Sequence, residues 1–235
     1  ACGLQCPGPI LKMKKTMDSL VSGDRVEITS TDPGFPRDAA AWCNSTGNQL
    51  ISKETAGGKS VVVIEKGEPK SCNIVTSCEG KGKTFIMFSD DLDKALATFV
   101  LANGAAATGQ KVTIFFTFWG LNVIKKLHKP NVEKDIFGKM FGMMLPSSSR
   151  KLKLSKMSMG GIGGKMMRYI MNRKGIDSLE SLRQQALENG VEFIACQMSM
   201  DVMGVKQEEL LDEVTIGGVA TYMERADNAN INLFI

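Results

Sequence analysis

The first part of the chain alternates between helical and strand-like hydrophobic patterns. The predicted elements are a helix at residues 9–21, a strand at 25–31, a helix at 32–47 and two strands at 49–54 and 60–66. The first helix is predicted from apolar residues at helical spacing, namely Ile10, Met13, Met17, Leu20 and Val21. Asp32 is a good helix N-cap, and Gly57-Gly58 suits a hairpin turn. Together these patterns predict a compact α/β unit over residues 1–67.

A second pattern begins after a polar stretch. Residues 68–82 are rich in Gly, Ser and Lys and are predicted to form a linker. Residues 112–118 are almost continuously apolar, which is typical of a parallel-sheet strand buried on both faces. Further strands are predicted at 83–89, 191–195 and 231–235, and helices at 92–109, 178–189 and 217–225. Strands that alternate with helices predict a parallel, doubly wound sheet over residues 83–235.

A basic, methionine-rich insertion interrupts this second unit at about residues 128–174. The net charge of +4 hides an asymmetry, because residues 125–174 hold 13 Lys/Arg and two acids, whereas the rest holds 16 and 23. Eight of the 15 methionines lie in the same stretch. Three interpretations stay open: helices whose methionines pack in an oligomer core, docking to an acidic partner, and peripheral contact with an anionic membrane. Nucleic acid is not expected, because aromatic residues for base stacking are sparse there.

The cysteines are few and widely spaced. They lie at positions 2, 6, 43, 72, 78 and 196 without a CxxC pair, which favours reduced thiols in a cytoplasmic protein. The sequence has neither a leader nor a run of about 18 apolar residues, so we expect no signal peptide and no transmembrane helix. His128 is the single histidine, and we expect no metal and no organic cofactor. Cys72 and Cys78 are either incidental linker thiols or a redox-sensitive pair.

Cys6 is the best candidate for chemistry. It lies just before the first predicted helix, where unpaired N–H groups and the helix dipole stabilise a thiolate. Lys12, Lys14 and Lys15 add positive potential within the next two turns. Such a thiolate could attack a sulfane sulfur, and the same field would hold the resulting persulfide anion. The alternative is a structural cysteine beside a proline-capped helix.

The stretch Gly3-Leu-Gln-Cys-Pro-Gly-Pro-Ile-Leu-Lys12 resembles the CPxP signature of TusA-like (SirA-like) sulfur carriers. The similarity continues through Gly23-Asp24, Asp32-Pro33 and Trp42-Cys43 to about Lys66. This resemblance implies a small βαβαββ two-layer sandwich with Cys6 as the sulfur-accepting residue. A family member usually has a full strand ahead of the motif, whereas only Ala1 and Cys2 precede Gly3 here, which favours a fragment of a longer polypeptide.

Cys196 is the second candidate. It ends a predicted strand of a parallel sheet, where ligands bind outside the carboxyl ends of the strands, although a core thiol fits the position equally well. Residues 83–235 resemble the DsrE-like family, in the subgroup with a long Met-rich insertion. The similar stretches are Ser89-Asp90-Asp91, Phe118-Trp-Gly-Leu121, Met157-Ser-Met-Gly-Gly161 and Ala195-Cys-Gln-Met-Ser-Met-Asp201. The resemblance implies that Cys196 is the family's thiol, that the chain forms homo-oligomers, and that rhodanese or disulfide reductase modules are associated with it.

The combined prediction is a cytoplasmic sulfur relay. Cys6 accepts sulfane sulfur as a persulfide and passes it to Cys196 or to an external acceptor, so that the chain acts as a sulfurtransferase or persulfide carrier. Lys12, Lys14 and Lys15 give electrostatic support. The alternative is a non-catalytic binding or regulatory module whose basic segment recruits an acidic partner. Persulfide formation on the cysteines distinguishes the two.

Overall fold

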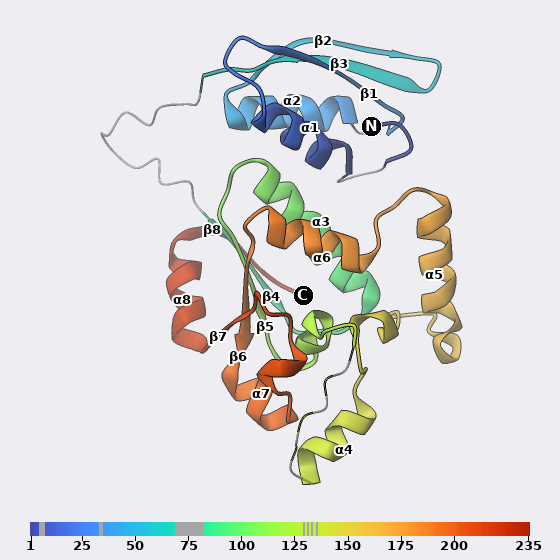
Figure 1. Cartoon of the computed structure of the whole chain (residues 1–235), viewed down its shortest axis with the longest axis vertical. Helices are drawn as coiled ribbons and strands as arrows, with labels where there is room; N and C mark the ends of the chain where they lie inside the picture. Colours follow the sequence, from blue (N-terminus) through green and yellow to red (C-terminus); the bar gives the residue numbers. More distant parts are fainter. Residues whose placement is uncertain are drawn as a thin grey trace.

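Two β-sheets organise the chain (Figure 1). The structure is a computed structural model and describes residues 1–4, 8–32, 35–68, 82–128, 130, 132, 134 and 136–235. Cys6, Cys72 and Cys78 therefore lie outside the described residues, as do residues 69–81 of the predicted linker.

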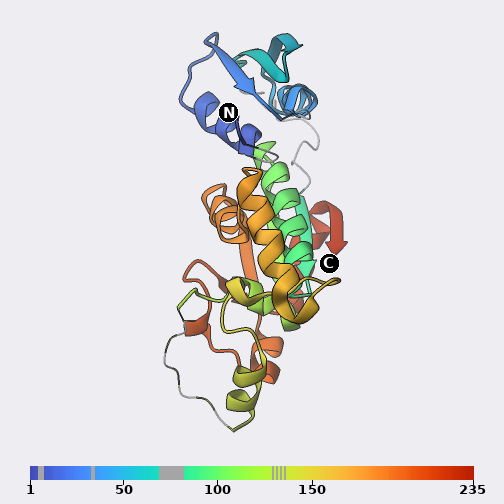
Figure 2. The same cartoon turned by 90° about the vertical axis from the view of Figure 1, so that its right-hand side faces the viewer.

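The N-terminal sheet is antiparallel and has the strand order β1-β3-β2. Its elements are α1 (Gly8–Asp18), β1 (Arg25–Ser30), α2 (Phe35–Thr46), β2 (Gln49–Ala56) and β3 (Lys59–Glu65). Both helices pack on one face of this sheet (Figures 1 and 2). The turn from β2 to β3 needs left-handed backbone at Gly57 (φ 58°) and Gly58 (φ 72°), which glycine adopts without strain.

The strand that the resemblance implies ahead of Cys6 is not among the described residues. Ala1–Leu4 run beside the end of β1 without joining its ladder. The Ala1 amino group donates to the Thr29 carbonyl at 2.8 Å, and the Gly3 N–H donates to Thr31 Oγ1 at 2.9 Å. The described part of this unit is therefore a three-stranded α/β layer pair.

The C-terminal sheet is parallel and has the order β7-β6-β5-β4-β8, which confirms the doubly wound prediction. Its strands are β4 (Gly82–Met87), β5 (Val112–Phe116), β6 (Glu192–Cys196), β7 (Thr215–Gly217) and β8 (Ala229–Phe234). The connecting helices are α3 (Leu92–Ala107), α6 (Leu179–Glu188), α7 (Gln197–Met203) and α8 (Val219–Asp227). β7 and α7 were not predicted, because both are too short to leave a clear period in the sequence.

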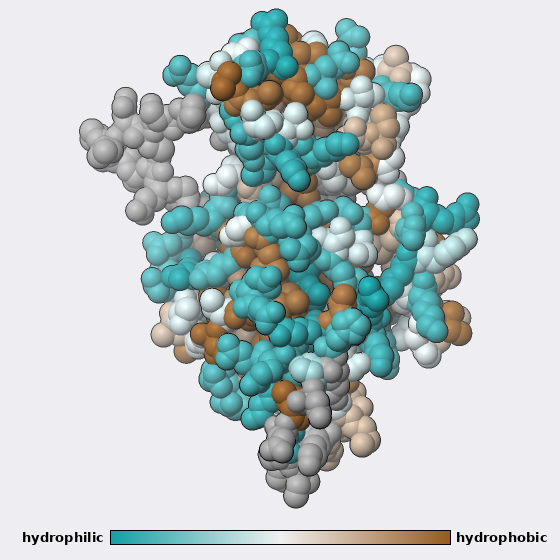
Figure 3. All heavy atoms as spheres, viewed as in Figure 1, coloured by the Kyte–Doolittle hydropathy of each residue, from teal (hydrophilic) through white to brown (hydrophobic). Residues whose placement is uncertain are grey.

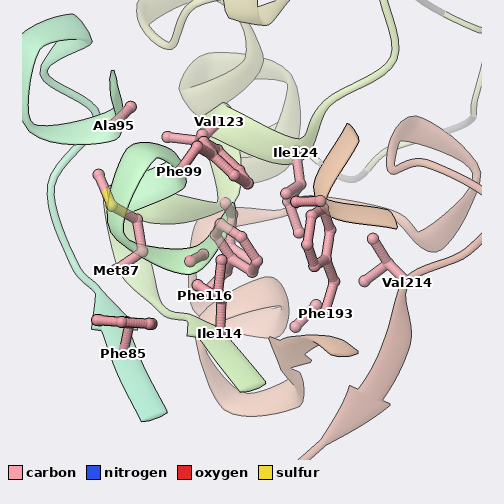
Figure 4. Close-up of a cluster of buried hydrophobic side chains, with 14 of the residues drawn as sticks. Phe85, Met87, Ala95, Phe99, Ile114, Phe116, Val123, Ile124, Phe193 and Val214 are labelled. Carbon is pink, nitrogen blue, oxygen red and sulfur yellow. The ribbon is translucent and has the colours of Figure 1, made fainter. Parts of the chain in front are cut away.

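The main core lies between this sheet and the helix pair α3 and α6. Phe99 of α3 packs on Phe116 and Phe193 with ring centroids 6.4 and 5.7 Å apart (Figure 4). β5 is buried at all five positions, as its apolar run predicts. A smaller cluster of buried residues lies on the opposite face of the sheet, under α8. Cys196 belongs to this cluster.

The basic insertion forms α4 (Ile136–Met144) and α5 (Ile162–Arg173) outside the sheet (Figure 1). A buried ion pair between Lys134 and Glu209 ties it to the body. Lys125, which is 4% exposed, donates to the Pro146 carbonyl at 3.2 Å. Among the described residues, no helix is long and apolar enough to cross a membrane.

Candidate functional site

The start of α1 positions the region around Cys6. Leu4 and Gly8 are the nearest described residues on either side of it. The backbone at Gly8 packs closely on the Leu4 side chain, because a Cβ there would lie 3.2 Å from Leu4 Cβ. Pro9 and Ile10 are buried in the first turn, so this end of the helix is anchored in the N-terminal core.

A cavity of about 650 Å³ lies between the two units, and both Leu4 and Gly8 line it. Its N-terminal wall carries the three lysines that the sequence singled out, Lys12, Lys14 and Lys15. The facing wall comes from the C-terminal unit and is formed by Asp177, Gln185, Glu188 and Asn189. The fold thus gathers the predicted lysines beside the residues that flank Cys6.

The three lysines of this wall differ in whether a carboxylate neutralises their charge. Lys14 forms an ion pair with Asp18 at 2.8 Å, so much of its charge is neutralised. Lys12 and Lys15 are exposed and have no carboxylate partner among the described residues. These two lysines give the wall a net positive potential, which the carboxylates of Asp177 and Glu188 across the cavity partly oppose.

The two units meet at the amino edge of the parallel sheet. Trp42 Nε1 donates to the carbonyl of Ala107, the last residue of α3, and Ala107 belongs to the N-terminal core cluster. Gly175 packs on the backbone of Gly3, where a Cβ would come within 2.0 Å of the Gly3 oxygen. Only glycine fits at position 175, both for this contact and because its φ is +66°.

Cys196 ends β6 and immediately precedes α7. It is 6% exposed and belongs to a cluster with Phe115, Ile194 and Tyr222 on the face that α8 covers. The residue opposite it on β7 is Gly217, which places no side chain next to the thiol. The sequence predicted a thiol at the carboxyl edge of the sheet, and the structure places it there in a buried, apolar setting.

Polar groups at the same edge were missed by sequence reasoning. Thr117 at the end of β5 and Ser199 in α7 share a buried hydrogen bond of 2.8 Å, which fixes α7 against the sheet. Asn122 donates to Asp90 at 2.9 Å, while Asn122 Oδ1 is buried without a partner among the described residues. Burial raises the pKa of the Asp90 carboxyl. Short polar residues after a strand gave no distinctive spacing that could have identified this group.

The turn that follows β5 explains one of the sequence signatures. Phe118 adopts φ 47°, and Gly120 lies so close to Met87 that a Cβ would come within 1.9 Å of the Met87 oxygen. Phe118 and Trp119 stack at 5.8 Å, and Phe88 packs on both rings. This corner shapes the carboxyl edge between β4 and β5.

The structure describes two further cysteines, Cys2 and Cys43. Cys43 is 2% exposed, and burial raises the pKa of its thiol to about 11. Cys2 is exposed and its Sγ lies 3.9 Å from the Thr29 carbonyl. Within the described residues, no cluster of His, Cys, Asp and Glu is arranged to hold a metal ion.

The two candidate regions lie at opposite ends of the C-terminal unit. The N-terminal unit docks at the amino edge, through Ala107 and the cavity wall near Asn189, whereas Cys196 lies at the carboxyl edge (Figures 1 and 2). From Glu192 to Cys196 the strand β6 alone spans about 13 Å, at roughly 3.3 Å a residue. The structure therefore gathers the three lysines beside Leu4 and Gly8, and Cys196 lies apart from them at the carboxyl end of β6.

These features define a two-part α/β protein with a lysine-bearing cavity wall beside Leu4 and Gly8 and with Cys196 in a buried cluster at the sheet edge. Comparison with known families assigns both parts. The chain belongs to the DsrE/DsrF/DrsH-like family through residues 80–234 and to the family described as Sulfurtransferase TusA through residues 1–66.

Three of the relatives each match one of the two parts. The uncharacterized protein YrkE of Bacillus subtilis is 44% identical over 155 residues, which cover 66% of this chain and 97% of YrkE. The sulfur carrier protein DsrE2 of Allochromatium vinosum is 38% identical over 161 residues, covering 67% of this chain and 99% of DsrE2. The sulfur carrier protein TusA of the same organism is 42% identical over 66 residues, covering 28% of this chain and 87% of TusA.

Proposed function

We propose that the chain is a sulfur carrier that accepts sulfane sulfur on Cys6. The observation that carries the proposal is the wall formed by Lys12, Lys14 and Lys15 next to Leu4 and Gly8, the described neighbours of Cys6. Positive charge favours a thiolate over a thiol and a persulfide anion over its acid. Relatives of both parts are named sulfur carrier proteins, which supports the same role.

The loading step is a thiol–persulfide exchange. The Cys6 thiolate attacks the outer sulfur of a donor persulfide R–S–SH. A new S–S bond forms on Cys6 while the donor S–S bond breaks, and the electron pair leaves on the donor thiolate, which takes up the proton. The products are the Cys6 persulfide and the donor thiol, so no external oxidant or reductant is consumed.

Cys196 is proposed as the second station. Its thiolate would attack the outer sulfur of the Cys6 persulfide, which returns Cys6 as a thiolate. The apolar surroundings of Cys196, with Phe115 and Tyr222, would shield a persulfide from solvent thiols. Since Cys196 is 6% exposed, transfer requires a local opening of this edge.

The separation of the two regions favours transfer between molecules. While the N-terminal unit is docked, the cavity beside Leu4 and Gly8 reaches Asn189, which precedes the amino end of β6, whereas Cys196 lies at the carboxyl end of that strand. We therefore propose that Cys6 delivers sulfur to the Cys196 of another copy or to a separate acceptor. Transfer within one chain would require the N-terminal unit to leave its docking site.

Partners and context extend the proposal. A rhodanese or disulfide reductase module is the proposed donor or acceptor, and free thiols are consistent with a reducing cytoplasm. A homo-oligomer is proposed because apolar side chains on α8 and β8 are left exposed, namely Val219, Met223, Ile231, Leu233 and Phe234.

The first test is mass spectrometry of the protein after incubation with polysulfide or a persulfidated donor. The expected result is one added sulfur on Cys6, lost in Cys6→Ser and kept in Cys2→Ser. Cysteines that all stay unmodified would favour the rival role, in which the basic segment recruits an acidic partner.

The second test follows labelled sulfur between two variants. Cys196→Ser protein loaded on Cys6 is mixed with Cys6→Ser protein, and both also lack Cys72 and Cys78. Label is expected on Cys196 of the second protein, at a rate that rises with its concentration. If no label reaches Cys196 in this mixture, and transfer returns when Cys72 and Cys78 are restored to an acceptor that carries Cys6→Ser and Cys196→Ser, the linker is the second station.

A further inference from the structure

The turn before α5 holds two methionines in a strained and exposed conformation. Met157 and Met159 have φ values of 57° and 43°, in the left-handed region that side chains other than glycine rarely adopt. Their side chains are 69% and 66% exposed. The strained backbone costs free energy, and the exposed side chains do not recover that cost by burial in this chain. This combination motivates the hypothesis that the two methionines contact a partner at the surface.

The helix that follows presents a second apolar stripe to solvent. Gly163, Gly164 and Met171 form its buried face. Gly163 allows this close docking, since a Cβ would lie 2.1 Å from the Met157 oxygen. Apolar side chains also occupy the outer face at i, i+4, i+7 and i+8, namely Ile162 (63% exposed), Met166 (46%), Tyr169 (63%) and Ile170 (39%). This spacing forms one continuous stripe on an α-helix.

Positive charge surrounds the stripe without any compensation. Residues 150–174 contain eight Lys/Arg and no Asp or Glu. Arg168 is used internally, donating to the Ser149 and Arg150 carbonyls at 3.1 Å. The other seven are exposed, and in the described part of the chain none has a carboxylate partner: Arg150, Lys151, Lys153, Lys156, Lys165, Arg173 and Lys174. Figure 3 shows hydrophilic and hydrophobic residues interleaved along the edge where α5 lies.

We propose that α5 and the turn before it form a peripheral binding surface for an anionic lipid bilayer. The outer stripe would enter the boundary between headgroups and acyl chains, with Tyr169 at the interface and the cations on the headgroups. A second copy of this surface is disfavoured, because it would oppose seven cations with seven cations. The absence of carboxylates over 25 residues suits a uniformly negative sheet of headgroups better than a protein surface with mixed charges.

The proposal is independent of sulfur transfer, so a flotation assay tests it without the thiols. Full-length protein is mixed with vesicles of phosphatidylcholine containing 30% phosphatidylglycerol or of phosphatidylcholine alone. We expect binding to the anionic vesicles, at least ten-fold weaker binding to neutral ones, and further loss as salt is raised. Cys6→Ser should bind as the unchanged protein does.

Matched variants assign the binding to the stripe. Met166→Gln with Ile170→Gln should weaken binding to anionic vesicles at least ten-fold, with an unchanged circular dichroism spectrum. Met198→Gln with Val202→Gln alters two exposed apolar residues of α7 at the same i, i+4 spacing and should leave binding unchanged. Lys165→Gln with Arg173→Gln should reduce the preference for anionic vesicles several-fold. The proposal is overturned if the unchanged protein does not float with anionic vesicles, or if the α7 pair weakens binding as much as the α5 pair. Binding to polyglutamate but not to vesicles would also overturn it, in favour of an acidic protein partner.

Discussion

The surroundings of the two candidate thiols contrast in polarity and access. The residues that flank Cys6 line an open cavity with lysines on one wall, whereas Cys196 is enclosed by aromatic and aliphatic side chains. A cationic, accessible site favours formation of a reactive anion, and a dry, enclosed site slows exchange with solvent thiols. The difference suggests a division of labour in which one thiol captures sulfur and the other retains it.

The largest expected effect is the loss of persulfide loading when Cys6 is replaced. Cys6→Ser should abolish persulfide loading from polysulfide, because the described thiols Cys43 and Cys196 are buried and Cys2 does not line the lysine-bearing cavity. Loading is measured by intact-mass spectrometry. Cys2→Ser removes an exposed thiol four positions away and is the control. If both variants keep full loading, capture takes place elsewhere in the chain.

The second prediction concerns the accessibility of the buried Cys196 thiol. Tyr222→Ala removes a ring from the Cys196 cluster and should raise the alkylation rate of Cys196 at least ten-fold, measured by peptide mass spectrometry. Loss of such a buried ring costs about 3 kcal/mol of unfolding free energy, so a circular dichroism melt must show that the protein remains folded. Tyr222→Phe keeps the ring and loses only the 3.2 Å hydrogen bond to Thr84, so it should behave like the unchanged protein. Equal rates in all three proteins would mean that the ring does not protect Cys196.

The third prediction concerns the lysine wall. Lys12→Gln with Lys15→Gln should slow Cys6 loading roughly four-fold at low salt, since two charges at about 10 Å in water each contribute about 0.4 kcal/mol. The difference should shrink at high salt through screening. Lys53→Gln with Lys59→Gln removes two exposed charges from the β2–β3 hairpin and should have no effect. A salt-independent loss would indicate a structural role for the wall.

The smallest effect at neutral pH is expected at Cys43. Burial raises its pKa to about 11, so the folded protein holds this thiol protonated where the unfolded chain would already ionise. The unfolded state then binds fewer protons, and stability should fall as the pH rises from about 9 toward 11. Urea titrations at pH 8 and pH 10.5 measure this. Cys43→Ala should lose the pH dependence in this window, and a persistent dependence would assign it to other groups.

Much of this architecture could be predicted from the sequence because local patterns are strong. The apolar run of β5, the stripe of α3 and the Gly57-Gly58 turn each determine an element without long-range information. The position of Cys196 at the carboxyl edge of a parallel sheet followed from strand–helix alternation alone. The lysines near Cys6 could be identified because they follow it within two helical turns.

Other features depend on contacts between residues far apart in the chain, which a one-dimensional pattern does not contain. The burial of Cys196 depends on Phe115 and Tyr222, and the facing wall of the lysine cavity comes from residues more than 150 positions away. The sequence also did not predict which face of α5 is exposed, because the contacts of Gly163 and Gly164 determine which side of the helix packs on the protein. The sequence by itself determined most of the elements, the two family assignments and the candidate thiols, but not the short elements β7 and α7. Only the tertiary structure decided that the lysine wall beside Leu4 and Gly8 lies at the edge opposite to Cys196, because the docking of one unit on the other is set by packing at Trp42, Ala107 and Gly175.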